Sequence, residues 1–188
     1  MTCSSKGGTL MAIDIDLYRR NIYVSTGHGN QHFRRISVID IEPDGAMQTI
    51  VFVHGFGGDV SQWLHQLRFF GQSMRVIAPN LRGHGLSEDP AGLAYTIESF
   101  VSDLEVTLEA LQVQSPFYLV AHSFGGVIAT EYVVRHPEEV RSLVLIGVST
   151  HFTMMPVLGR LLHIPDPLFS FVAKRLGIAL FASQRTLK

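Results

Sequence analysis

Residues 117–135 constrain the fold of this chain more than any other segment. The run FYLVA is typical of a buried strand, and it enters His122, Ser123 and Phe124 with no intervening loop. Gly125 and Gly126 follow, and a helical pattern then continues to residue 135. A strand, a tight turn and a helix in direct succession form a unit of parallel sheets. We therefore expect strands and helices to alternate around this segment.

The rest of the chain shows that alternation. Apolar or β-branched runs predict strands at residues 21–26, 36–41, 50–54, 74–79, 116–121 and 142–148, of which the last four are expected to be buried. Helical spacing predicts helices at residues 61–70, 96–112 and 124–135. The first two strands have no helix between them and predict an antiparallel hairpin. The fold class is therefore α/β, a mostly parallel sheet with helices on both faces.

The chain changes character after Thr150. Residues 154–182 are apolar and predict short helices, which are broken at Pro156 and at the prolines of the IPDP turn. We expect residues 1–150 to form the N-terminal part of the α/β core and residues 151–188 to begin a helical cap or lid.

The turn at Ser123 has the composition of a nucleophile elbow. A serine raised on a strained turn needs small residues two positions before and after it, and Ala121 and Gly125 meet that condition. The helix that starts at Phe124 directs backbone N–H groups toward developing negative charge. We predict Ser123 as a nucleophile and the Phe124 N–H as one oxyanion donor. The simpler alternative is that Ser123 only caps the helix.

A second glycine-rich turn follows the strand predicted at residues 50–54. Here the sequence is HGFGG, and glycines at Gly55, Gly57 and Gly58 allow the backbone to approach a reacting carbonyl. The Phe56 N–H is the candidate for the second oxyanion donor. An ordinary tight turn is the alternative. A phosphate loop is disfavoured because no lysine followed by serine or threonine is present in this segment.

Three motifs together resemble the α/β-hydrolase superfamily, in that family's order. They are VHGFGG, then APNLRGHGLSEDP after the next strand, then AHSFGG, and the resemblance covers residues 36–150. It implies hydrolysis of ester, thioester, amide or carbon–carbon bonds by a serine mechanism. Asn80 stands where the family usually has aspartate, a departure that bears on the hydrogen bonds of the loop. By the same resemblance the chain is truncated, because the family's later strands, acid and histidine do not follow.

No base for Ser123 can be assigned from the nine histidines. His122 precedes Ser123 and is expected to point to the opposite face, while His151 follows a predicted strand but has no acidic residue beside it. A sheet that ends at residues 142–148 would expose an apolar edge. We expect a fragment of a longer enzyme, with a natural truncation or a partner that completes the site as alternatives.

The composition excludes several functions. Lysine and arginine number 15 against 16 aspartates and glutamates, so no nucleic-acid partner is expected. The one cysteine, Cys3, excludes zinc clusters built on cysteine, and we predict no cofactor and no metal. Without a signal-like apolar stretch at the start, a cytoplasmic location is expected.

The sequence thus predicts a serine hydrolase that acts on a carboxylic ester or related small acyl substrate of apolar character. The alternative is a non-catalytic hydrolase-fold module without acid and histidine. Attachment of residues 154–182 to a membrane surface is the less favoured role for that segment, and the oligomeric state is open.

Overall fold

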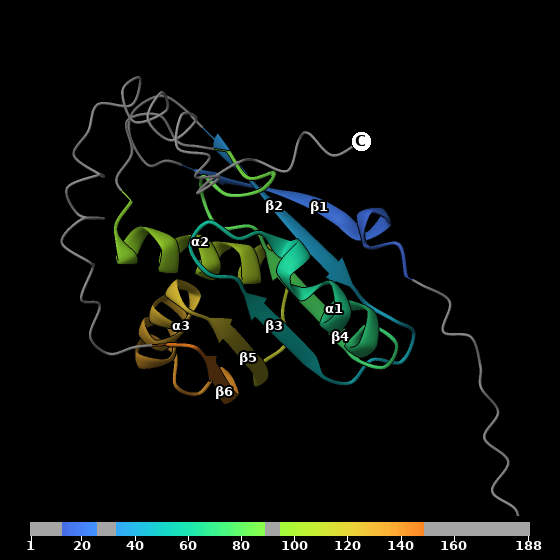
Figure 1. Cartoon of the computed structure of the whole chain (residues 1–188). Helices are drawn as coiled ribbons and strands as arrows, with labels where there is room; N and C mark the ends of the chain where they lie inside the picture. Colours follow the sequence, from blue (N-terminus) through green and yellow to red (C-terminus); the bar gives the residue numbers. More distant parts are fainter. Residues whose placement is uncertain (1–12, 26–32, 89–94, 149–188) are drawn as a thin grey trace, which may run out of the picture.

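The computed structural model describes residues 13–25, 33–88 and 95–148 (Figure 1). The predicted lid lies outside these residues, as do His28, His32, His151 and His163. The elements in chain order are η1 (Ile15–Tyr18), β1 (Arg19–Ser25), β2 (Phe33–Ile41), β3 (Thr49–Val53), η2 (Val60–Trp63), α1 (Leu64–Phe70), β4 (Arg75–Pro79), α2 (Ile97–Ala110), β5 (Phe117–His122), α3 (Phe124–Arg135) and β6 (Val140–Ile146). In this part of the chain no helix is long and apolar enough to cross a membrane.

The strands form one sheet in the order β1-β2-β4-β3-β5-β6, which can be followed in Figure 1. β2 is antiparallel to both of its neighbours, β1 and β4. The remaining pairs, β3 with β4, β3 with β5 and β5 with β6, are parallel. The predicted hairpin and the mostly parallel sheet are therefore confirmed. The carboxyl ends of β3, β4 and β5 consequently lie along one edge, where open α/β sheets place their sites.

Side chains that alternate along the strands build two separate cores. Val51, Val53 and Leu119 face α2 and α3, where they pack with residues such as Leu104 and Ile128. The intervening strand residues belong to the second core, which contains Ile50, Phe52, Trp63, Leu67, Val76 and Val120. Helices therefore cover both faces of the sheet, α2 and α3 on one side and η2 with α1 on the other.

Two predicted boundaries shift for local reasons. The helix expected at residues 61–70 begins with a 3₁₀ turn, because the Asp59 side chain accepts a hydrogen bond from the Ser61 N–H and caps this turn. β6 ends two residues earlier than expected, before Gly147, whose φ of +60° departs from strand geometry.

The expectation that β6 is buried was wrong. Val144, Leu145 and Ile146 are 44–48% exposed, and among the described residues β6 pairs only with β5. Burial in a parallel sheet requires a neighbour on each side and a covering layer on each face. The exposed apolar edge expected for a sheet that ends at this strand is thus what the described residues show.

Candidate active site

Ser123 occupies a strained turn between β5 and α3. Its φ and ψ are 50° and −118°, a conformation that non-glycine residues rarely adopt. The Ser123 N–H donates to Ile146 O at 2.9 Å, and its carbonyl accepts from the Gly126 N–H at 2.9 Å. β6 and the first turn of α3 therefore hold the strained residue from both sides.

The residues around the turn leave no room for larger side chains. Ala121 is fully buried. A Cβ at Gly125 would lie 2.7 Å from Val53 O and still closer to His54 O, and both of these atoms belong to the backbone. Small residues at these two positions thus allow the end of β3 to pack directly against the elbow.

We expect Gly125→Ala to destabilise the protein by about 1–3 kcal/mol, because the added methyl group must displace the backbone of β3. Urea unfolding followed by circular dichroism measures the change. Val134→Ala is the control, because Val134 is exposed on the same helix and its truncation should alter stability by less than about 0.5 kcal/mol. Equal stability of Gly125→Ala and wild type would contradict the packing described above.

The glycine-rich turn after β3 lies against the elbow. A Cβ at Gly55 would lie 3.2 Å from Ser123 Cβ and 2.9 Å from His122 Nδ1. The turn is held by two further bonds, from the Gly58 N–H to Gly55 O at 3.1 Å and from the Gly55 N–H to Gln62 Oε1 at 3.3 Å. The structure thus brings together the two turns that the sequence singled out.

Aromatic rings cluster at this junction. The Phe56 ring is 62% exposed and lies edge-on to the Phe124 ring, with 6.1 Å between centroids. Phe56 also meets His84 at 5.7 Å, and Phe124 meets Phe100 at 5.1 Å. A cavity of about 860 Å³ begins beside Phe56 and is also bordered by Gly57, His84 and Tyr95. Aromatic rings therefore border the elbow, whereas the cavity beside Phe56 also has polar lining residues such as Asp59 and Gln62.

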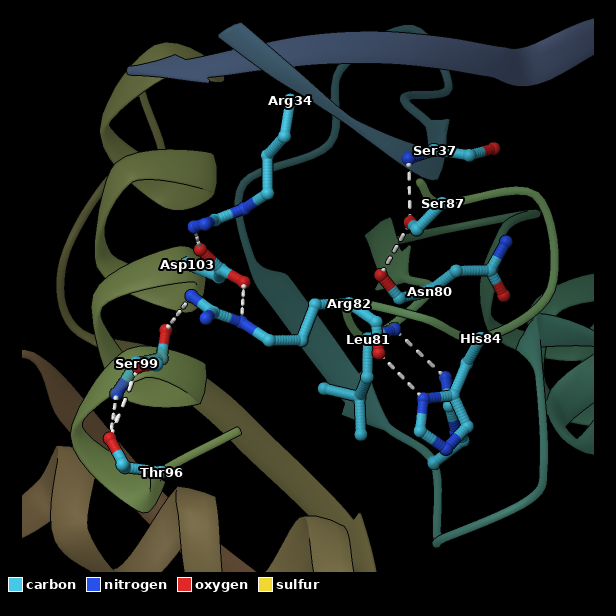
Figure 2. A network of polar contacts seen from close by, with 11 residues as sticks. Arg34, Ser37, Asn80, Leu81, Arg82, His84, Ser87, Thr96, Ser99 and Asp103 are labelled. Atoms are coloured by element: carbon cyan, nitrogen blue, oxygen red, sulfur yellow. Dashed lines mark hydrogen bonds and ion pairs between the residues drawn. The ribbon is translucent and has the colours of Figure 1, made fainter. Parts of the chain in front are cut away.

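The loop after β4 keeps its hydrogen bonds in spite of Asn80. Asn80 is buried, and its Oδ1 accepts from the Val60 N–H at 2.9 Å, while its carbonyl accepts from the Ser87 hydroxyl at 2.8 Å. Ser87 Oγ in turn accepts from the Ser37 N–H (Figure 2). The Asn80 amide thus connects this loop to η2, and the Ser87 hydroxyl connects it to β2.

A buried charge network anchors the same loop. Figure 2 shows Asp103 of α2 between Arg34 of β2 and Arg82. Arg82 Nε donates to Asp103 Oδ2 at 2.7 Å, and its Nη2 donates to Ser99 O at 2.6 Å. Burial, and secondarily the charge of Arg34, lowers the pKa of Arg82 to about 10, so it remains a cation at neutral pH. One carboxylate therefore compensates two buried guanidinium groups.

Among the described residues, no histidine nitrogen makes a hydrogen bond with Ser123 Oγ. His54 is fully buried and hydrogen bonded through both ring nitrogens. The His122 ring lies between Gly55 and Gly147, and its buried Nδ1 has no hydrogen-bond partner. His65 is exposed on α1. The nucleophilic role of Ser123 and the oxyanion roles of Phe56 and Phe124 therefore stay predictions.

A possible metal-binding group lies elsewhere. Among the described residues, ligand atoms of His136, Glu138 and Glu139 fall within 4.8 Å of one another. His136 Nε2 already lies 3.0 Å from Glu105 Oε1. This group follows the C-terminal end of α3, about 18 Å from Ser123 at the rise of an α-helix. It does not belong to the elbow site.

Sequence reasoning missed the charge network and the contacts of His54. Asp103 interrupts an otherwise apolar helix face between Val101 and Leu104, and that interruption was the available signal. Its two partners lie 69 and 21 residues earlier in the chain, so spacing alone could not identify them.

Several known proteins are similar to this chain in sequence. Residues 48–182 match the alpha/beta hydrolase fold family. The chain is 38% identical over 106 residues to 2-hydroxy-6-oxo-2,4-heptadienoate hydrolase of Pseudomonas putida, which covers 55% of this chain and 38% of that protein. It is also 38% identical over 111 residues to 2-hydroxymuconate semialdehyde hydrolase of a Pseudomonas species, covering 57% of this chain and 39% of that protein.

A solved structure shows the same likeness. The epoxide hydrolase of Bacillus megaterium, in complex with an inhibitor, superposes with a TM-score of 0.55 at 32% identity, covering 61% of this chain and 39% of the other. The chain spans about two fifths of the length of these relatives. The family match itself covers more than half of this chain. The chain therefore belongs to the α/β-hydrolase fold family.

Proposed function

We propose that the full-length protein is a serine hydrolase that cleaves a carboxylic ester or a related acyl compound. The observation that carries this proposal is the strained backbone of Ser123, with Gly55 packed against it. Backbone strain of this kind is concentrated at functional sites. In a nucleophile elbow, the strained turn raises the serine hydroxyl above the end of the strand. The relatives named as hydrolases support the same class of reaction.

The reaction would proceed through an acyl-enzyme. Ser123 Oγ attacks the carbonyl carbon while its proton passes to a general base, and the carbonyl electrons move onto oxygen. The alkoxide or amine leaves with a proton as the carbonyl re-forms. Water gives a proton to the base as it attacks the acyl carbon, the bond from Ser123 Oγ to that carbon breaks with return of a proton to Oγ, and the carboxylic acid leaves. The base and its orienting acid would come from outside the described residues.

The N–H groups of Phe56 and Phe124 would stabilise the oxyanion of the tetrahedral intermediate. The first belongs to the turn packed against Ser123, and the second follows Ser123 at the start of α3. The positive end of the helix dipole adds to this stabilisation. Removal of one such donor typically costs about 10²- to 10³-fold in kcat.

Labelling with a fluorophosphonate tests the nucleophile. The reagent forms a covalent phosphonyl ester with an activated serine, and mass spectrometry of a tryptic digest of the full-length protein should locate the adduct on Ser123. Absence of labelling would argue for the non-catalytic alternative, and labelling at another serine would contradict the nucleophilic role of Ser123.

The substrate's acyl group is proposed to be apolar. The rings of Phe56 and Phe124 pack edge-on to one another beside the elbow and offer apolar surface there. A carbonyl placed between the two N–H groups would put its substituent against these rings.

We expect Phe56→Ala to change substrate selectivity. The variant keeps the backbone N–H but loses the ring, so kcat/KM for a p-nitrophenyl hexanoate should fall about 10- to 100-fold, within the range for one lost apolar contact. The value for p-nitrophenyl acetate should change by less than about threefold, since acetate is too short to use that contact. An equal fall for both esters would show that the ring supports the turn rather than the substrate.

A further inference from the structure

The oxyanion role proposed for Phe56 depends on the direction of a single peptide unit. The Phe56 N–H and the Gly55 carbonyl belong to the same trans peptide, and in such a planar unit they point in opposite directions. Any group that fixes Gly55 O therefore also aims the Phe56 N–H. Gly55 O has two partners, the Gly58 N–H at 3.1 Å and His54 Nδ1 at 2.8 Å.

The second nitrogen of His54 fixes its tautomer. His54 Nε2 lies 3.0 Å from the Leu81 N–H, which can only donate, so Nε2 must be the acceptor. Gly55 O can only accept, so Nδ1 must carry the proton. A neutral imidazole with its hydrogen on Nδ1 satisfies both contacts. The ring therefore joins the turn after β3 to the loop after β4, which the Arg82–Asp103 ion pair anchors.

The surroundings of His54 favour that neutral form. The side chain is fully buried, and burial is the main cause that lowers its pKa to about 4. The His84 ring, 5.4 Å away, lowers the pKa further, whereas the Gly55 carbonyl and Asp59 raise it. Protonation would place a hydrogen on Nε2 against the Leu81 N–H and break the link between the two loops.

The Gly55–Phe56 peptide follows a glycine. Gly55 carries no Cβ, so its ψ is less restricted than that of other residues. A flipped Gly55–Phe56 peptide would direct a carbonyl oxygen, not an N–H, toward the substrate's oxyanion. The bonds from His54 and Gly58 to Gly55 O oppose that flip.

We propose that His54 is a positioning residue that aims the Phe56 N–H into the oxyanion hole by holding the Gly55 carbonyl. The proposal rests on the function proposed above, and it assigns the buried imidazole a role in transition-state binding without contact to substrate. Three substitutions separate its two hydrogen bonds. His54→Asn can place an amide N–H near the Nδ1 position, His54→Gln can place an oxygen near the Nε2 position, and His54→Leu provides neither.

The first test measures the rate of fluorophosphonate labelling at Ser123 in the full-length protein, because the phosphonyl oxygen occupies the oxyanion hole. We expect His54→Asn to retain the rate within about fivefold, and His54→Gln and His54→Leu to lose about 10²-fold, as on removal of one oxyanion donor. Melting temperatures of all three variants should fall together, which controls for a purely structural role. Equal rates per folded molecule in Asn and Gln variants would overturn the proposal.

A second test does not depend on activity. Proton–nitrogen correlation spectra of protein with ¹⁵N-labelled histidine should show His54 as the Nδ1–H tautomer, without titration between pH 8 and about 5. An Nε2–H tautomer, or titration near the ordinary histidine pKa of about 6.5, would overturn the proposal. If wild type showed the expected tautomer but no labelling at Ser123, the function proposed above would fail while the His54 geometry stood.

Discussion

Replacement of Ser123 by alanine should lower kcat/KM of the full-length protein for its ester substrates by at least about 10³-fold. A serine hydrolase that loses its nucleophile retains only the rate supplied by the oxyanion hole and by substrate binding. Alanine preserves the Cβ and the backbone of the elbow, so binding should change little. Steady-state kinetics with p-nitrophenyl esters measures the loss, and active-site labelling should disappear in parallel.

Two further variants test whether that loss comes from the hydroxyl. Ser102→Ala removes an exposed hydroxyl from α2 and should leave the kinetics unchanged. Ser123→Gly should be as inactive as Ser123→Ala but about 1–3 kcal/mol more stable, since glycine adopts the φ of 50° without strain. Substantial turnover by the alanine variant would refute the nucleophilic role of Ser123.

The largest expected effect on stability comes from Asp103→Ala. The Asp103 side chain is only 6% exposed, and its carboxylate forms ion pairs with the guanidinium groups of Arg34 and Arg82, which are themselves buried. Loss of the carboxylate removes an ion pair from each of two buried cations, a change that typically costs about 3–5 kcal/mol. Urea denaturation should show this as a lower midpoint with an unchanged slope.

A control and a partial rescue make the prediction specific. Glu109→Ala removes an exposed carboxylate from the same helix and should alter stability by less than about 0.5 kcal/mol. Arg34→Met in the Asp103→Ala background should restore part of the lost stability, because it removes one of the two buried charges that Asp103 pairs with. If Asp103→Ala were within about 1 kcal/mol of wild type, the network would contribute little to stability.

Local patterns were sufficient to predict the main elements of this fold. Strong apolar runs and the absence of a loop before Ser123 predict β3, β4, β5 and α3, and each lies within about two residues of its expected position. The two glycine-rich turns could be paired in advance because parallel strands bring their carboxyl ends to one edge. Their contact through Gly55 and Ser123 follows from that topology.

What could not be predicted depends on contacts between distant segments. The sequence contains several arginines and several acidic residues on α2, and nothing local assigns Arg34 to Asp103. The bond between His54 and Leu81 likewise joins residues 27 positions apart. The prediction that β6 is buried was wrong for the same reason, because an apolar strand has the same sequence pattern in the centre of a sheet as at its edge.

The two separate cores also determine what each spectroscopic probe reports. Trp63 is the single tryptophan of the chain and lies in the core that η2 and α1 cover. Its fluorescence monitors that face, whereas α2 and α3, the two longest helices of the described residues, contribute far-ultraviolet ellipticity from the opposite face. Coincident transitions of the two signals would mean that the sheet transmits unfolding from one face to the other as a single cooperative event.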